Sequence, residues 1–155
     1  IVLGLLNLDG NVDVAGTREL IQIARPMNVT FHRAFDMSRD LQKALRDIID
    51  AGADRILTSG GEPQAERALP VIAGLVQAAG SRIIIMACGA VDAGNARKIV
   101  QQTGVREVHA GMNVFTASPM RYHNEKIAMG AVEGMEYQRS YVPEEQVRKL
   151  KEELK

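Results

Sequence analysis

The sequence predicts an α/β fold built on a parallel β-sheet. Five short runs rich in β-branched and apolar residues recur along the first 109 positions, and each gap between them has the apolar spacing of a helix. A strand and a helix therefore repeat about every 25 residues, which is the period of a parallel βαβ array. We expect residues 1–155 to form a single α/β domain.

Each element of the repeat can be placed by its own residues. The expected strands are residues 1–5, 29–33, 55–59, 82–87 and 107–109. The expected helices are residues 14–25, 41–51, 64–79 and 94–103. Candidate caps agree with these bounds, because glycines that favour left-handed C-caps follow three of the helices and short polar residues that favour N-caps precede three. These residues are Gly52, Gly80 and Gly104 at the ends, and Asp13, Ser38 and Asp92 at the starts.

The repeat stops after residue 109. Residues 110–140 form a long segment with few periodic positions, for which we expect no helix. A last helix is expected from Pro143, because proline and two acidic residues occupy its first turn and lysines follow later, as the helix dipole favours.

Two parallel architectures compete for this pattern, an open doubly wound sheet and a (β/α)8 barrel. The polar residues at the strand ends favour the barrel. If Val29 and Val108 face the helices, then Thr30 and Glu107 face inward, each followed two positions later by a histidine that also faces inward. We therefore expect a TIM-barrel type of fold with about five βα units in this chain.

Composition limits the class of function. The chain has 19 basic and 19 acidic residues, so no net charge attracts nucleic acid or an anionic membrane surface. No apolar run approaches the length of about 20 residues that spans a bilayer. Cys88 is the single cysteine, which excludes an intrachain disulfide and fits a reducing compartment. We expect a cytoplasmic protein without a nucleic-acid or membrane partner.

The second strand ends in the most informative cluster, because catalytic and binding residues of parallel α/β proteins lie at the carboxyl ends of strands. His32 could act as a general base or a metal ligand. Arg33 suits a carboxylate or phosphate, through its planar fork of donors. Asp36 could pair with that arginine and fix the loop, or cap the following helix. A purely structural ion pair is the competing interpretation.

Two further groups of polar residues follow later strands. Glu107 and His109 are candidate catalytic residues, with the glutamate either orienting the histidine or joining an interior hydrogen-bonded network. Thr58, Ser59 and Gly60 could cradle an anionic group with hydroxyls and free amides, or simply form a tight turn.

Three remaining candidates concern anions and soft metals. Arg121 lies in the long segment after the last strand and could bind an anion at the barrel mouth, although loop arginines more often form surface ion pairs. Met86 and Cys88 at the end of the fourth strand could bind Cu(I), which prefers sulfur ligands. A lone buried cysteine more often packs as a small apolar residue.

Four blocks of sequence, in this order and spacing, resemble the CutC family of proposed copper-homeostasis proteins. They are VTFHRAFD at 29–36, LTSG at 57–60, EVH at 107–109 and ASPMRY at 117–122. The resemblance covers nearly the whole chain. It implies a (β/α)8 barrel whose last five βα units correspond to this sequence, and a role in cytoplasmic copper homeostasis with a copper ion as partner.

The resemblance also raises two expectations about what this chain lacks. The first three βα units of the family have no counterpart here, so we expect either a portion of a longer protein or a homo-oligomer that covers the open sheet edges. The cysteines proposed as Cu(I) ligands in the family lie mainly in that missing part.

Two functions from different classes therefore remain. One is copper binding or handling, which rests on the resemblance. The other is an enzyme or binding protein for a small anionic metabolite at the barrel mouth, which rests on residue types at strand ends; whether catalysis occurs is left open.

Overall fold

The computed structural model describes residues 1–124, 126–127 and 134–155, and it contains five parallel strands in one sheet. These strands are β1 (Val2–Leu3), β2 (Thr30–Phe31), β3 (Arg55–Thr58), β4 (Ile84–Ala87) and β5 (Glu107–Val108). The helices between them are α1 (Val14–Ala24), α2 (Leu41–Ala51), α3 (Leu69–Ala79) and α4 (Ala96–Thr103). All five predicted strands and the four helices predicted between and after them, up to residue 103, are present.

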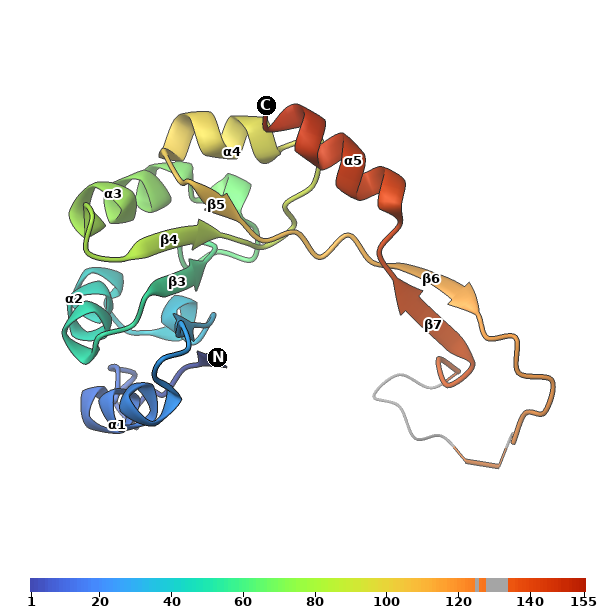
Figure 1. Cartoon of the computed structure of the whole chain (residues 1–155), viewed down its shortest axis with the longest axis horizontal. Coiled ribbons are helices and arrows are strands. Elements are labelled where there is room, and N and C mark those ends of the chain that lie inside the picture. The colour runs from blue at the N-terminus through green and yellow to red at the C-terminus, as the bar shows by residue number, and fades with distance from the viewer. Residues whose placement is uncertain (125, 128–133) are drawn as a thin grey trace.

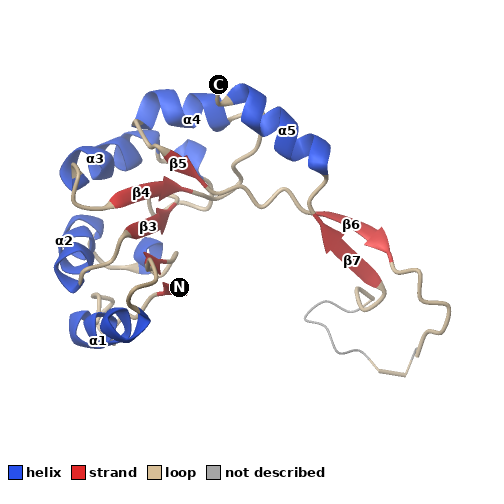
Figure 2. Ribbon diagram, in the orientation of Figure 1, coloured by secondary structure: helices blue, strands red, loops and turns tan. Residues whose placement is uncertain are grey.

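The strands lie in the sheet in the same order as in the sequence, β1-β2-β3-β4-β5, and every neighbouring pair is parallel. Figure 1 and Figure 2 show α1 to α4 on the same convex side of this sheet. A doubly wound sheet would reverse its strand order and carry helices on both faces. The prediction of an α/β fold of TIM-barrel type with five βα units is therefore confirmed.

The two faces of the sheet differ in chemistry, as alternation along each strand requires. One row across the sheet, from Leu3 through Phe31 and Ile56 to Ile85, is buried against the helices. The neighbouring row starts at exposed Val2 on β1 and includes half-buried Thr30 and Arg55. The concave face thus carries the polar strand residues that the barrel interpretation places inward.

Two of the three predicted N-caps are wrong. Asp13 caps α1, since its side chain accepts a hydrogen bond from the Gly16 N–H. The cap of α2 is Asp40 and not Ser38, because a 3-10 turn over Phe35–Met37 intervenes and the Ser38 hydroxyl donates to the Phe35 carbonyl instead. Asn95, and not Asp92, precedes α4.

The predicted helix at residues 64–79 is divided into a 3-10 turn over Ala65–Arg67 and α3. Pro70 lies in the first turn of α3, where its missing N–H costs nothing, and it cannot continue a helix from the preceding turn. Ala68 joins the two pieces with a backbone that is not helical.

Beyond β5, the structure contains a second, small sheet that the sequence analysis did not predict. Strands β6 (Val114–Ala117) and β7 (Gln138–Tyr141) pair antiparallel and project away from the β/α array in Figure 1. We call the described residues of this part of the chain, 114–124, 126–127 and 134–141, the ribbon. The last helix, α5 (Glu144–Glu153), begins directly after Pro143, as expected. It contacts α4. Within the described part of the chain, no helix is long and apolar enough to cross a membrane.

Candidate functional site

The loops after β2, β3 and β4 are tied together at the carboxyl edge of the sheet. The Cys88 N–H donates to the Thr58 carbonyl at 2.8 Å, and the Ala65 N–H donates to the Gly89 carbonyl at 3.1 Å. The 3-10 turn over Phe35–Met37 brings Asp36 to the loop after β3. The predicted residues of β2 and β3 therefore form one connected group.

The Asp36 carboxylate is the centre of this group, and its side chain is only 5% exposed. Its Oδ1 accepts hydrogen bonds from Thr58 Oγ1 at 2.5 Å and from the N–H groups of Ser59 and Gly61 at 3.1 Å each. Its Oδ2 accepts from Arg33 Nε at 2.8 Å and from Ser59 Oγ at 3.0 Å. Burial raises the pKa of Asp36, but these hydrogen bonds outweigh burial and hold the pKa below its ordinary value.

The groups that were predicted to bind an outside anion therefore bind the carboxylate of Asp36 instead. Thr58 and Ser59 both donate to Asp36, whereas the Gly60 N–H donates to Thr58 Oγ1 at 2.8 Å. An outside phosphate or carboxylate would reach these groups only by displacing Asp36. The geometry favours a structural role for this part of the predicted site.

The guanidinium of Arg33 is bound through Nε and Nη2, whereas its Nη1 is not. Its Nε donates to Asp36, and its Nη2 donates to Ser59 Oγ at 2.5 Å and to the Glu62 carbonyl at 3.1 Å. The hydrogen bond to Asp36 raises the pKa of Arg33. Nη1 has no hydrogen-bond partner among the described residues, and the side chain is 44% exposed. The ion pair fixes the guanidinium and leaves donors for a ligand.

His32 has a defined tautomer. Its Nδ1 accepts a hydrogen bond from the Ala34 N–H at 3.0 Å, so the neutral ring carries its proton on Nε2. The ring packs on Gly4, where a Cβ atom would lie 2.6 Å from both Cε1 and Nδ1. The sequence analysis did not select Gly4, although a glycine within a predicted strand often marks a site where another group packs close to the backbone.

We predict that Gly4→Ala displaces the His32 ring, because a contact of 2.6 Å cannot be kept. The hydrogen bond to Ala34 then breaks, and the ¹⁵N chemical shifts of the His32 ring move toward those of a free imidazole with mixed tautomers. Gly74→Ala is the control, since a Cβ there meets nothing within 4 Å. Unchanged His32 ring shifts in Gly4→Ala would contradict the packing.

Glu107 and His109 do not form the pair that one interpretation expected. The Glu107 carboxylate is bound by the Arg55 guanidinium through two hydrogen bonds, Nη2 to Oε1 at 2.8 Å and Nε to Oε2. The bond from Arg55 lowers the pKa of Glu107. Arg55 also reaches Thr30, and His109 is exposed at the end of β5. Glu107 therefore joins a hydrogen-bonded pair on the concave face, with an arginine that the sequence analysis did not select.

The sulfur candidates lie on β4 and just beyond it. Met86 is half-buried, and Cys88 is 2% exposed. Burial raises the pKa of the Cys88 thiol to about 12, and the nearby Arg33 charge offsets this only in part. Among the described residues, no three His, Cys, Asp or Glu side chains gather as a group that could hold a metal ion.

We predict that Cys88 reacts very slowly in the folded protein. With a pKa of about 12, only about one thiol in ten thousand is ionised at pH 8, against about a quarter for a free cysteine. Labelling by a thiol-specific disulfide reagent should be at least about a hundredfold slower without urea than with it. Equal labelling rates in the two conditions would show that the thiol is accessible and ionised.

Arg121 does not lie with the other candidate site residues. It follows β6 in the ribbon, which points away from the sheet, and its side chain is exposed (Figure 1). His123, two positions after Arg121, stacks on Tyr137 with ring centroids 3.9 Å apart, within the ribbon itself.

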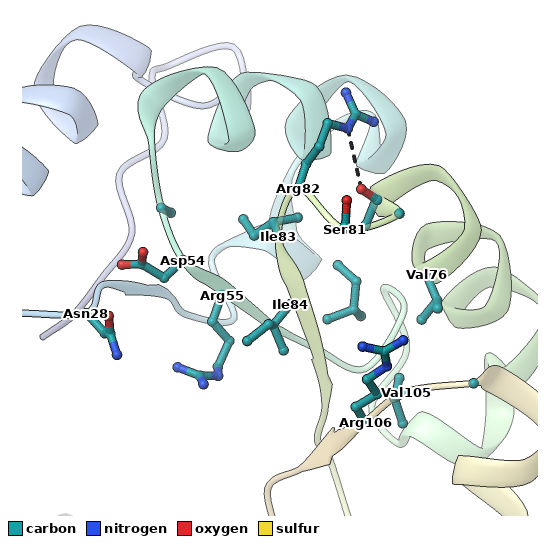
Figure 3. Close-up of a pocket in the computed structure, with 15 residues that line it drawn as sticks. Asn28, Asp54, Arg55, Val76, Ser81, Arg82, Ile83, Ile84, Val105 and Arg106 are labelled. Atoms are coloured by element: carbon teal, nitrogen blue, oxygen red, sulfur yellow. Dashed lines mark hydrogen bonds between the residues drawn. The ribbon is translucent and has the colours of Figure 1, made fainter.

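A cavity of about 520 Å³ lies at the opposite, amino-terminal ends of β3, β4 and β5 (Figure 3). Its wall includes Arg55, Arg82 and Arg106, one before or at the start of each strand. Figure 3 shows these side chains spread around the cavity, without one shared point of contact. Arg82 donates to the Ala78 carbonyl at 2.6 Å and so caps α3. The sequence analysis did not predict this cavity, although arginines recur at or just before the starts of these strands.

Known proteins match this chain over most of its length. A profile of the CutC family matches residues 1–114. A CutC family protein of Chromobacterium violaceum is 44% identical over 154 residues, covering 99% of this chain and 62% of the relative. One of Mesorhizobium japonicum is 43% identical over 141 residues, covering 91% of this chain and 54% of the relative.

A solved structure agrees with these matches. The CutC protein of Streptococcus agalactiae superposes with a TM-score of 0.65 at 34% identity, over 70% of this chain and 54% of that one. The chain thus spans between about half and about two thirds of the length of these relatives. On the family profile and on these identities over nearly its whole length, the chain belongs to the CutC family.

Proposed function

We propose that this chain binds a small metabolite with one phosphate or carboxylate group at the carboxyl edge of its sheet. Arg33 is the anion ligand, and His32 donates a second hydrogen bond from Nε2. The observation that carries the proposal is the arrangement of Arg33, whose Nε and Nη2 are fixed by Asp36 and Ser59 while Nη1 stays unoccupied among the described residues.

Preorganisation supports this assignment. A flexible arginine loses side-chain entropy when it binds a ligand, whereas a guanidinium already held by a buried carboxylate does not. His32 is similarly held, by the Ala34 N–H and by its packing on Gly4. Both residues directly follow β2, at the strand end where barrels bind their ligands.

Charge limits the kind of ligand. Asp36 already compensates one positive charge of the site, and Glu107 compensates Arg55 on the concave face. The charge of Arg33 is already balanced by Asp36, so a diphosphate or a nucleotide would bring more negative charge than the described residues of the site can offset. A ligand with a single anionic group fits better, in line with the absence of a nucleotide-binding glycine motif from the sequence.

A panel of sugar monophosphates and small carboxylates, screened by thermal shift and then measured by isothermal titration calorimetry, tests the proposal. A ligand at 100 times its Kd should add about 2.7 kcal/mol of stability. We expect Arg33→Lys to weaken binding at least tenfold, because lysine lacks the fork of donors. Exposed Arg39→Ala is the control. A panel without ligands, or Arg33→Lys binding like wild type, would refute the proposal.

A second candidate is copper handling in the cytoplasm. The S. agalactiae relative has a name that proposes copper homeostasis for it. Cys88 follows Met86 by two positions at the end of β4, so two sulfur ligands of the type Cu(I) prefers lie near one another in sequence. The protonated state of the buried thiol weighs against this candidate.

Anaerobic Cu(I) titration against a strong competing chelator separates the two candidates. If the chain handles copper through β4, Cys88→Ser should lose at least tenfold in affinity, and Met27→Leu, at an exposed methionine, should lose nothing. Binding too weak to compete, or equal in both variants, would exclude copper at this strand.

A further inference from the structure

The loop between β4 and α4 contains an unusual backbone conformation. Ala90 has a φ of +53°, and among the described residues it is the only one other than glycine with a positive φ. A side chain in this region of backbone space is strained by contacts with the neighbouring peptide groups. Such a conformation persists only where surrounding contacts impose it, and it occurs most often at functional sites. The contacts that hold Ala90 therefore point to what the loop does.

Asn95 holds this loop through both ends of its side-chain amide. Its Nδ2 donates to the Ala90 carbonyl at 2.7 Å, and its Oδ1 accepts from the Asp92 N–H at 3.0 Å. Asn95 directly precedes α4, a position where an asparagine usually accepts a hydrogen bond from the first turn of the helix. Here the side chain makes no such bond to the helix. Asn95 therefore stabilises the loop and does not cap α4.

Gly89, the residue before Ala90, connects this loop to the loop after β3. Its carbonyl accepts from the Ala65 N–H at 3.1 Å. A Cβ atom at Gly89 would lie 3.0 Å from the Pro63 carbonyl oxygen and 3.1 Å from Ser59 Cβ. The backbone of Gly89 thus packs directly against both ends of the loop after β3, and a shift of Gly89 would move that loop.

The loop after β3 in turn holds the guanidinium of Arg33. Arg33 Nη2 donates to Ser59 Oγ at 2.5 Å and to the Glu62 carbonyl at 3.1 Å. Both acceptors belong to the segment on which Gly89 packs. Because these two bonds fix Nη2, the direction of the unoccupied Nη1 depends on where this loop lies.

We propose that Asn95 is a positioning residue of the anion site, a role that rests on the proposed function of Arg33. Asn95 keeps Ala90 in its strained conformation, which places the Gly89 carbonyl on Ala65 and so fixes the loop that orients Arg33. Asn95 acts through these two loops and not on the ligand. Without its side chain, Ala90 relaxes to a negative φ in part of the molecules. The apparent affinity for an anion then falls with the fraction of molecules in which Arg33 is correctly placed.

Titration with inorganic phosphate, followed by the amide NMR signals of residues 32–37, measures this effect on affinity. We expect Asn95→Ala to bind phosphate at least about threefold more weakly than wild type. Adding Ala90→Gly to that variant should restore the affinity, because glycine adopts a positive φ without strain. The control is Asn28→Ala, at an exposed position before β2, which should bind like wild type. Wild-type affinity in Asn95→Ala, or no recovery with Ala90→Gly, would overturn the proposal.

A measurement without any ligand separates this proposal from the proposed function. In Asn95→Ala, we expect faster hydrogen exchange of the Ala65 N–H and a shifted NMR signal of the Arg33 Nε–H, which donates to Asp36. Ala90→Gly should return both signals toward wild type. Unchanged signals in Asn95→Ala would overturn the positioning role, whether or not phosphate binds. Moved signals, together with a wild type that binds no anion, would refute the proposed function and support the link between Asn95 and Arg33.

Discussion

Asp36→Asn is expected to lower the free energy of unfolding by about 3 kcal/mol. The carboxylate accepts hydrogen bonds from Arg33 and Thr58, two backbone N–H groups and one further hydroxyl. An amide offers only one acceptor oxygen, so buried donors lose their partner, at about 1 to 3 kcal/mol each. Arg33 is 44% exposed and adds little to this sum. Urea denaturation followed by circular dichroism measures the loss.

The pH dependence of the same variant gives an independent check. The pKa of Asp36 is lower in the folded chain than in the unfolded one, so its contribution is complete above the unfolded value near 4 and is lost as the pH falls through the folded pKa. The gap between wild type and Asp36→Asn should narrow below about pH 4. Asp50→Asn, at an exposed position, should show no gap. A gap that is constant with pH would contradict the assignment.

Gly60→Ala is expected to cost about 3 kcal/mol of folding free energy. Gly60 has a φ of +73°, which an alanine adopts only with strain. A Cβ there would also lie 2.6 Å from Ala68 Cβ and 3.1 Å from Ile72 Cγ1. Both neighbours are buried, so neither can move without disturbing the packing of α3 on the sheet.

Gly52→Ala separates the two causes. Gly52 has a φ of +95°, but a Cβ there meets nothing within 4 Å, so only the backbone strain of about 1 kcal/mol remains. The difference between the two variants in urea denaturation isolates the steric part. Equal losses would show that the loop after β3 yields to the added methyl group.

The fold was predictable because strand and helix periodicity agrees with the turn residues. The predicted helix at residues 41–51 has the same bounds in the structure, where an αL glycine at position 52 ends it. The predicted N-terminal ends of α2 and α3 were wrong, because a short 3-10 turn precedes each helix and such turns show no periodicity in the sequence. The ribbon was missed because its strands, VFTA and QRSY, are almost wholly exposed, so they have no buried face that alternating apolar residues would mark.

That the side chains after β2 and β3 lie close together was predictable from the sequence, but most of their contacts were not. An ion pair between Arg33 and Asp36 was one of the interpretations left open by the sequence, beside a helix cap by Asp36, and the structure shows the ion pair. The role of Thr58 and Ser59 as partners of Asp36 required the relative placement of two loops, which local sequence does not specify. Arg55 pairs with Glu107 across the intervening strand β4, and a contact 52 residues apart leaves no local pattern.

An amide NMR titration with the tightest sugar monophosphate or carboxylate of the panel is the most direct test of the proposed anion site. We predict saturable shifts in the N–H signals of residues 32–37 and 59–62, around Arg33 at the carboxyl edge of the sheet. Shifts confined to residues 81–84 and 104–106, which line the arginine-rich cavity at the opposite end, would contradict the proposed site.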